Sequence, residues 1–279
     1  MSSRADIVNK KRIVVKIGSS SLFHAETGGL NFLKIEKLAR ILADISNQGK
    51  DVILVSSGAI ATGRTIVNIP AGINDIPVRQ ACAAIGQAQL ITIYQRMFAE
   101  YGKTAAQVLL TRYTIHSKLT RTNASNTFKE LLNLGAIPVV NENDTVTTEE
   151  IEFGDNDCLS AMVGILSDAD MLIILSDIDG LYDSDPRENP DARFISTVES
   201  LDDEILKMGQ GAGSSYGTGG MASKLEAAKM AYAAGIDMVI TNAADLDNIT
   251  RVMNGEEIGT FFRSGEGHNF VFEEFDIKD

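Results

Sequence analysis

The chain contains 279 residues, 44% of them hydrophobic, and carries a formal net charge of −13. This is enough apolar material for one large α/β domain or two closely joined lobes. The acidic balance argues against nucleic acid as a partner, because binding to a phosphate backbone requires a basic surface.

The cysteines and the apolar runs bear on the compartment. Cys82 and Cys158 are too few and too far apart for a disulfide framework or a metal site, and their apolar surroundings predict buried thiols of a reducing compartment. No apolar run approaches the roughly 20 residues of a membrane span, and the first ten residues lack the apolar centre of a signal peptide. We therefore expect a cytoplasmic protein with no membrane partner.

Short β-branched runs alternate with helical patterns along the chain. Asn31 is placed to cap a helix that stops at Gly49, and Asp75 and Pro77 are placed to open a longer helix that reaches Tyr101. The expected strands span residues 12–17, 51–55, 104–110, 137–140, 171–175 and 238–241. Continuous apolar strands separated by helices predict a three-layer α-β-α sandwich around a mainly parallel open sheet. Within this single domain we expect two lobes, at about residues 1–165 and 166–279.

Small and polar residues follow four of the expected strands. Parallel sheets bind ligands at the carboxyl ends of their strands, so these residues should share one rim of the sheet. Each group taken alone is more simply a turn or a helix cap, whereas four groups on one rim favour a ligand site. The groups are Gly18-Ser19-Ser20, Ser56-Ser57-Gly58, Asn141-Glu142-Asn143-Asp144 and Ser176-Asp177.

A glycine-lined turn delivers a lysine to the start of a helical pattern. Residues 217–224 read Gly-Thr-Gly-Gly-Met-Ala-Ser-Lys, and a second lysine, Lys16, closes the apolar run of the first strand. Glycines let backbone amides approach an anion closely, and a helix N-terminus adds positive potential. The spacing is not that of a Walker A loop, and a glycine run is as often a mobile loop as a phosphate cradle. Because Lys16 is a second lysine at the end of a strand, we interpret the turn as a phosphate-binding site.

Taken in order, these motifs resemble the amino acid kinase family, in particular its glutamate-phosphorylating branch. The resemblance extends over nearly the whole chain and includes Gly154-Asp155-Asn156-Asp157 and the run from Ser176 to Tyr182. It implies ATP-dependent phosphorylation of the γ-carboxylate of L-glutamate to L-glutamyl 5-phosphate, the first step of proline biosynthesis. Other acceptors of the same family, N-acetylglutamate, aspartate or uridylate, remain alternatives, as does a nucleotide-binding sensor without catalysis. The Asn-Glu-Asn-Asp and Gly-Asp-Asn-Asp motifs favour glutamate.

The resemblance also implies roles for single residues. Lys16 and Lys224 would stabilise the transferring phosphoryl group, and Asp157 would orient both lysines. The glutamate-binding positions, all in the N-terminal lobe, would be Ser57, Asn141, Asp144 and Asn156. The ATP-binding positions would be Lys16, Gly18, Ser176, Asp177, Thr218, Gly219, Gly220, Met221, Ala222, Ser223 and Lys224. Family members often have threonine at the place of Ser176, and the hydroxyl is kept here. Mg²⁺ would bridge the ATP phosphates with few protein contacts, so no protein ligand for a metal is assigned.

The family also suggests partners and regulation. L-Proline is the expected feedback inhibitor, and the loop at residues 65–75 is a candidate to order when it binds. Members often carry a C-terminal RNA-binding-like domain called PUA, which we expect this chain to lack. The expected protein partners are further copies of the chain, as a dimer or tetramer, and a glutamyl phosphate reductase that would take up the product.

Overall fold

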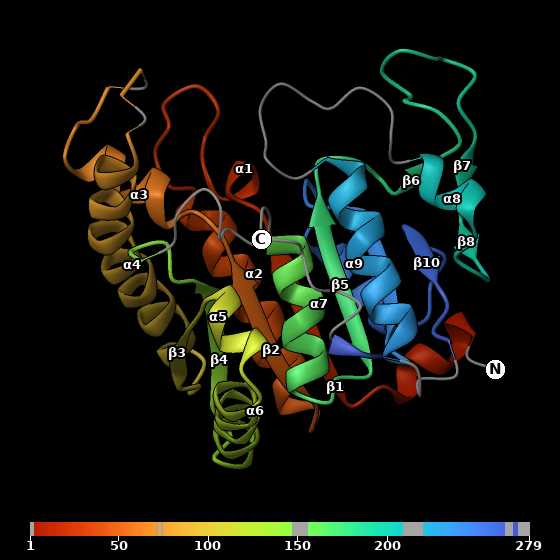
Figure 1. Cartoon of the computed structure of the whole chain (residues 1–279), viewed down its shortest axis with the longest axis horizontal. Coiled ribbons are helices and arrows are strands. Elements are labelled where there is room, and N and C mark those ends of the chain that lie inside the picture. Colours follow the sequence, from red (N-terminus) through yellow and green to blue (C-terminus); the bar gives the residue numbers. More distant parts are fainter. Residues whose placement is uncertain are drawn as a thin grey trace. The chain divides into compact units, whose positions relative to one another are not determined.

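The computed structural model describes residues 3–70, 72–73, 75–146, 156–208, 220–265 and 270–272. The chain divides into two compact units (Figure 1). The first unit comprises residues 1–16 and 154–276, and the second comprises residues 17–153 and 277–279.

The second unit contains parallel strands whose residues are largely buried. β4 (Ile137–Glu142) pairs in parallel with β2 (Asp51–Ser56) and β3 (Ala105–Leu110), and all six of its residues are buried. Such continuous burial is typical of a strand covered on both faces. The helices of this unit are α1 (Ser19–Leu22), α2 (Phe32–Asn47), α3 (Ala59–Ile66), α4 (Ile76–Ala99), α5 (Arg112–His116) and α6 (Lys118–Asn133).

Helix α2 shows how local sequence sets the ends of these elements. The side-chain oxygen of Asn31 accepts from the Lys34 amide at 3.0 Å, which satisfies one of the unpaired donors at the helix start. Gly49 follows the helix at φ +82°, a left-handed conformation that glycine adopts without strain. The expected cap and stop of this helix are therefore confirmed.

Helices α3 and α4 pack with their backbones in contact. A Cβ atom added at Gly63 would lie 1.9 Å from the carbonyl oxygen of Cys82, and one added at Gly86 would lie 1.8 Å from that of Ala59. Distances this short leave no room for a side chain at either position. Because α3 follows β2 after only two residues, the crossing also holds the turn at the end of β2 against α4.

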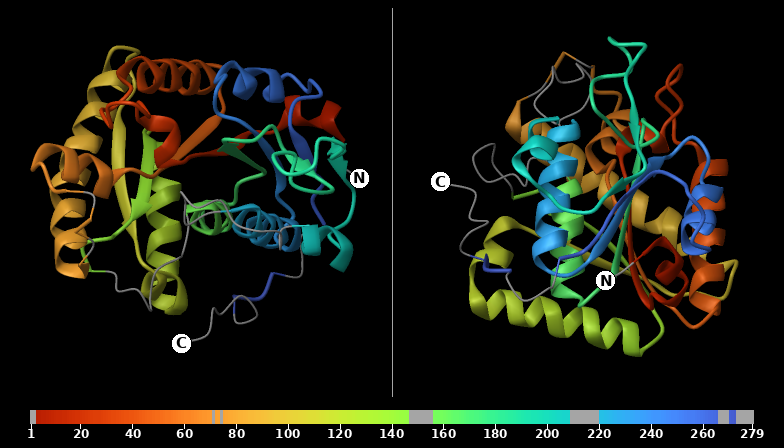
Figure 2. Two further views of the ribbon diagram at one scale, coloured as in Figure 1. Left: turned by 90° about the horizontal axis from the view of Figure 1, so that it is seen from above. Right: turned by 90° about the vertical axis from the view of Figure 1, so that its right-hand side faces the viewer.

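The first unit combines parallel strands with strands that run in the opposite direction. β5 (Met171–Ser176) pairs in parallel with β9 (Asp237–Asn242), and β10 (Thr260–Phe262) runs antiparallel to β9. Helices α7 and α9 cover one face of these strands and α10 covers the other (Figure 2). The remaining strands are β1 (Arg12–Ile17), β8 (Thr197–Val198) and the small pair β6 (Leu181–Tyr182) and β7 (Phe194–Ile195). The helices are the 3-10 helix η1 (Arg4–Asn9), α7 (Asn156–Leu166), α8 (Asp203–Met208), α9 (Met221–Ala233) and α10 (Asp247–Met253).

One side chain ties the start of the chain to the last strands of the first unit. The Arg4 guanidinium donates to the carbonyl oxygens of Ile258 at 2.9 Å, Gly259 at 2.7 Å and Ser196. It also lies 5.6 Å from the centre of the Phe261 ring, within the range of a cation–π contact. Burial lowers the pKa of Arg4, but an arginine remains protonated at neutral pH. The contacts of Arg4 therefore join the first residues of this unit to β10 and the residues before it.

The expected fold class is confirmed. The sheet has eight strands in the order β3-β4-β2-β1-β5-β9-β10-β8, is mainly parallel, and has helices on both sides. The six expected strands are present, but the fourth continues beyond Val140 to Glu142, so Asn141 lies within the strand rather than after it. The expected turn after the first strand is a single helical turn, α1. Among the residues that the structure describes, no helix is long and apolar enough to cross a membrane.

The glycine crossing predicts a strong effect of a single methyl group. Gly86→Ala should lower the free energy of unfolding by about 3 kcal/mol, because the methyl group would overlap the Ala59 carbonyl and force α3 and α4 apart. Urea denaturation followed by circular dichroism measures this change. Gly72→Ala is the control, since nothing lies within 4 Å of a Cβ there, and it should change stability by less than about 0.5 kcal/mol. Equal effects of the two substitutions would contradict the close contact.

Candidate active site

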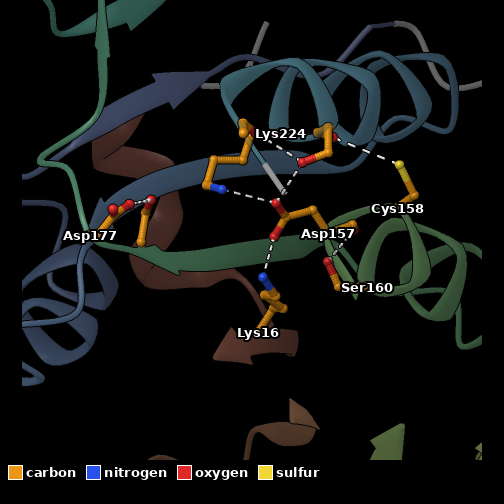
Figure 3. A network of polar contacts seen from close by, with 9 residues as sticks. Lys16, Asp157, Cys158, Ser160, Asp177 and Lys224 are labelled. Atoms are coloured by element: carbon orange, nitrogen blue, oxygen red, sulfur yellow. Dashed lines mark hydrogen bonds and ion pairs between the residues drawn. The ribbon is translucent and has the colours of Figure 1, made fainter. Parts of the chain in front are cut away.

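A buried carboxylate in the first unit holds two lysine side chains. Asp157 lies in the first turn of α7 and has no exposed surface. Its Oδ1 is 2.6 Å from the Lys16 Nζ, and its Oδ2 is 3.0 Å from the Lys224 Nζ (Figure 3). The structure therefore brings together the three residues that the sequence assigned to catalysis.

The three residues come from three different elements. Lys16 is the penultimate residue of β1, and Lys224 is the fourth residue of α9, which packs beside α7. Both ammonium groups belong to side chains that are at least nine-tenths buried. Their short distances to a fully buried carboxylate make these bonds charge-assisted and stronger than neutral hydrogen bonds. The strand and both helices must consequently fold before the cluster exists.

Further contacts fix the carboxylate and the start of α9. The Ser223 hydroxyl lies 3.0 Å from Asp157 Oδ2 and 2.9 Å from the Gly220 carbonyl oxygen, and can donate to either. The Cys158 thiol donates to the Ser223 carbonyl oxygen at 3.8 Å, which links α7 to α9. The Ser160 hydroxyl donates to the Asp157 carbonyl oxygen at 2.6 Å. As expected, both cysteines are buried free thiols.

The electrostatics of the cluster suit an anion. Asp157 stands at the start of α7, and Lys224 stands near the start of α9, so the positive ends of two helix dipoles lie beside two ammonium groups. Two lysines held at fixed positions can neutralise charge that develops on a transferring phosphoryl group. The cluster can therefore bind and polarise a phosphate.

The end of β5 carries the other assigned nucleotide positions of this unit. Ser176 is the last residue of the strand and is buried, and its hydroxyl donates to Asp177 Oδ1 at 3.2 Å. Asp177 is exposed and is drawn beside the lysine cluster in Figure 3. Gly220 caps the start of α9, which begins with Met221, Ala222 and Ser223. Thr218 and Gly219 lie outside the described residues.

The assigned acceptor residues belong mainly to the second unit. Ser57 follows β2, and its amide donates to the Ile17 carbonyl oxygen at 3.2 Å. Gly58 follows at φ +108° and opens α3, a conformation that requires glycine. Asp144 lies in the turn after β4 in which the Val146 amide donates to the Asn143 carbonyl oxygen at 3.2 Å. Asn156 is in the first unit, beside Asp157, and Gly18 caps the short helix α1.

Sequence reasoning missed two buried polar residues of α4, Gln87 and Tyr94, which contact the ends of β4 and β2. The Asn141 side-chain amide donates to Gln87 Oε1 at 3.0 Å, and the hydroxyls of Tyr94 and Ser56 lie 2.8 Å apart. Burial raises the pKa of Tyr94, so its phenol stays protonated and can donate. Gln87 and Tyr94 occupy the same stripe of α4 as the buried residues Ala83 and Leu90. A glutamine in an otherwise apolar stripe was the signal available in the sequence.

Fold and site together define a class of protein. A mainly parallel sheet with helices on both sides, carrying a buried pair of lysines beside helix N-termini, is typical of α/β proteins that bind nucleotide phosphates. A sequence profile of the Amino acid kinase family matches residues 11–242, which is most of the chain. The chain belongs to the amino acid kinase family.

Named relatives and solved structures agree with this membership. The chain is 52% identical to Glutamate 5-kinase of Carboxydothermus hydrogenoformans over 259 residues, which are 93% of this chain and 69% of that protein. It is 48% identical to Glutamate 5-kinase of Clostridium perfringens over 268 residues, 95% of this chain and 99% of that protein. The crystal structure of UMP kinase from Ureaplasma parvum superposes with a TM-score of 0.63 at 16% identity, over 91% of this chain and 99% of that one. At that identity the likeness shows the fold alone.

Removing the charge of Asp157 should destabilise the chain. Asp157→Asn should lower the free energy of unfolding by about 3 kcal/mol, because two buried ammonium groups lose the anion that offsets their desolvation. Chemical denaturation at pH 7 measures the loss. Asp168→Asn, at an exposed position two residues after the end of the same helix and in a left-handed conformation that asparagine tolerates, should change stability by less than about 0.5 kcal/mol. If Asp157→Asn were as mild as this control, the cluster would not be electrostatically coupled.

Proposed function

We propose that the chain transfers the γ-phosphoryl group of ATP to the γ-carboxylate of L-glutamate, giving L-glutamyl 5-phosphate and ADP, as the first step of proline biosynthesis. The observation that carries the proposal is the Lys16–Asp157–Lys224 cluster in a chain about half identical to proteins named Glutamate 5-kinase. An acceptor oxygen would form a bond to the γ-phosphorus while the bond from that phosphorus to the bridging oxygen of ADP breaks.

The chemistry requires position and charge rather than a base. A carboxylate with an ordinary pKa of about 4.3 is already an anionic nucleophile at neutral pH. What remains is to align it with the phosphorus and to neutralise the charge on the phosphoryl oxygens. Lys16 and Lys224 supply the two positive charges, and Asp157 holds both at fixed positions. Such charge stabilisation is the largest single contribution in comparable sites.

Nucleotide and acceptor would be bound by different parts of the chain. The first unit would bind ATP through Gly220–Lys224, which start α9, and through Ser176 and Asp177 at the end of β5. The second unit would bind glutamate through the hydroxyl of Ser57 and the amide of Asn141, with Asp144 receiving the α-ammonium group. The Asn156 amide would donate to a carboxylate of glutamate, and Gly18 would lie near the phosphates.

Magnesium would arrive with the nucleotide. Among the described residues no group of three or more histidine, cysteine, aspartate or glutamate side chains is placed to hold a metal ion. Mg²⁺ keeps several waters and is commonly bound through substrate phosphates with one or two carboxylates, so it would enter with ATP. It would neutralise part of the phosphate charge. We place the protein in the cytoplasm, as a dimer or tetramer, with a glutamyl phosphate reductase consuming the reactive acyl phosphate.

An ADP-release assay with a panel of acceptors tests the proposed function. With ATP and Mg²⁺ present, L-glutamate should support turnover, whereas L-aspartate and UMP should not. N-Acetyl-L-glutamate should be a poor substrate, because acetylation removes the cation that Asp144 would receive. Turnover with N-acetylglutamate or UMP that equals turnover with glutamate would overturn the assignment.

A pair of lysine variants attributes the activity to the cluster. Lys224→Met should reduce kcat by a factor on the order of 10² to 10³, the size of effect seen when charge stabilisation is lost at comparable sites. Lys229→Met is the matched control, since Lys229 is exposed on the same helix and pairs only loosely with Glu226 at 3.9 Å. It should leave kcat within about twofold of wild type, since exposed pairs contribute little.

We also propose feedback inhibition by L-proline, which the family resemblance implies. Proline shares an α-carboxylate and a cationic amine with glutamate but lacks the γ-carboxylate, so it would occupy the part of the acceptor site near Asp144 and order the loop at residues 65–75. Millimolar proline should inhibit initial rates, and excess glutamate should relieve the inhibition. An unchanged rate at millimolar proline would contradict feedback inhibition. Inhibition that glutamate cannot relieve would show that proline binds outside the acceptor site.

A further inference from the structure

Two buried polar side chains of helix α4 contact the ends of two strands. Gln87 and Tyr94 are seven residues apart, which places them on the same face of the helix two turns from each other. Gln87 contacts Asn141 in β4, and Tyr94 contacts Ser56 at the end of β2. Both strand ends carry residues that the proposed function assigns to the acceptor. Helix α4 therefore contacts the two strand ends that carry the proposed acceptor residues.

Burying the amides of Gln87 and Asn141 costs more desolvation free energy than burying two apolar side chains. The contact therefore points to a functional role. Gln87 is 7% exposed and Asn141 is 3% exposed, and a buried amide is stable only while it is hydrogen-bonded. Packing alone would be served by a leucine or methionine on this stripe of α4. A buried amide pair is instead directional, because one side chain must donate and the other accept.

The direction of this bond fixes the Asn141 amide. Its nitrogen donates to Gln87 Oε1, so its oxygen is turned away from Gln87. An asparagine amide has nearly the same shape after a half-turn about its last bond, but a half-turn exchanges an acceptor for a donor. An ammonium group has only donors and can be bound only by acceptors. Which way Asn141 is turned therefore decides whether it attracts or repels a cationic amine.

We infer that Gln87 is a positioning residue, which holds the Asn141 oxygen in the direction that accepts from the α-ammonium group of the acceptor amino acid. The inference rests on the proposed function, which assigns Asn141 to that ligand. Through this bond the site would distinguish an amino acid from a simple dicarboxylate of the same length. Gln87 itself would touch neither the substrate nor the reacting atoms.

The surroundings of α4 make Gln87 a rigid support. The helix is locked against α3 at Gly63 and Gly86, the latter directly preceding Gln87. Tyr94 is protonated, so it can donate to Ser56 and leave the Ser56 hydroxyl to donate to the Ser57 carbonyl oxygen at 3.2 Å. A support that cannot shift holds a side chain within the narrow limits that recognition requires.

The test compares ligands with and without the amine. Gln87→Met keeps the length of the side chain and removes the acceptor. In the full chain it should raise the KM for L-glutamate about tenfold, or about 1.4 kcal/mol. The KM for ATP should stay within about twofold, as should the Ki of glutarate as a competitive inhibitor, since glutarate has both carboxylates and no amine. General loosening of the site would instead weaken the binding of glutamate and the binding of glutarate to a similar extent.

Several outcomes would overturn the inference. An unchanged KM for glutamate would do so, and so would a Ki for glutarate that rises in parallel. Gln89→Met, the same substitution on the exposed face of α4, is the control and should leave all three constants unchanged. Gln87→Glu keeps an oxygen that can accept from Asn141, so its KM for glutamate should remain within about threefold of wild type. A Glu variant with the full tenfold loss would count against the inference even if the Met variant fails to fold.

The wild-type chain separates this inference from the function on which it rests. If wild type releases no ADP with glutamate, the proposed function fails. If wild type turns over glutamate and the Gln87→Met variant matches it, only the role of Gln87 fails.

Discussion

The first unit is organised around one carboxylate that water does not reach. Removing an ionised carboxylate from water costs several kcal/mol unless opposite charges and hydrogen bonds offset the loss. For Asp157 the offset comes from Lys16 in β1 and from Ser223 and Lys224 at the start of α9. Because Asp157 itself lies at the start of α7, one strand and two helices depend on the same charge. The condition that makes this burial tolerable also places two ammonium groups where a phosphate would meet them.

The second unit depends on shape instead of charge. Gly63 and Gly86 let α3 and α4 approach until their backbones touch. This contact also holds the turn between β2 and α3 in place. On that base the buried contacts of Gln87 and Tyr94 fix a strand residue and a strand end. A kinase that accepts an anionic carboxylate has no base to position, so the selection of its acceptor rests on how such polar atoms are held. On the proposed function, α4 and its neighbours would therefore set how precisely the acceptor is held.

The sequence predicts features that are local or that belong to a recognisable motif. The strand at residues 12–17, the Asn31 cap and the Gly49 stop all follow from runs and caps within a few residues. Lys16, Asp157 and Lys224 were found because motifs far apart in the chain resemble one family. The contacts of Gln87 with Asn141 and of Tyr94 with Ser56 join residues 54 and 38 positions apart, and no local pattern specifies such partners. The helix crossing at Gly63 was missed for the same reason, since a glycine in a helix does not reveal which backbone it will meet.

The first unit is discontinuous, and this has a consequence for synthesis of the chain. Residues 1–16, which include most of β1, leave the ribosome before the whole of residues 17–153, while β5 and β9 follow later. At the rate of protein synthesis this delay is on the order of 10 s, long enough for the intervening unit to fold first. During that interval Ile13, Val14 and Val15 lack β5, one of the two strands that flank β1 in the sheet. Lys16 meets Asp157 only after the delay, and Lys224 is made later still, so a newly made chain completes the Lys16–Asp157–Lys224 cluster among the last steps of its folding.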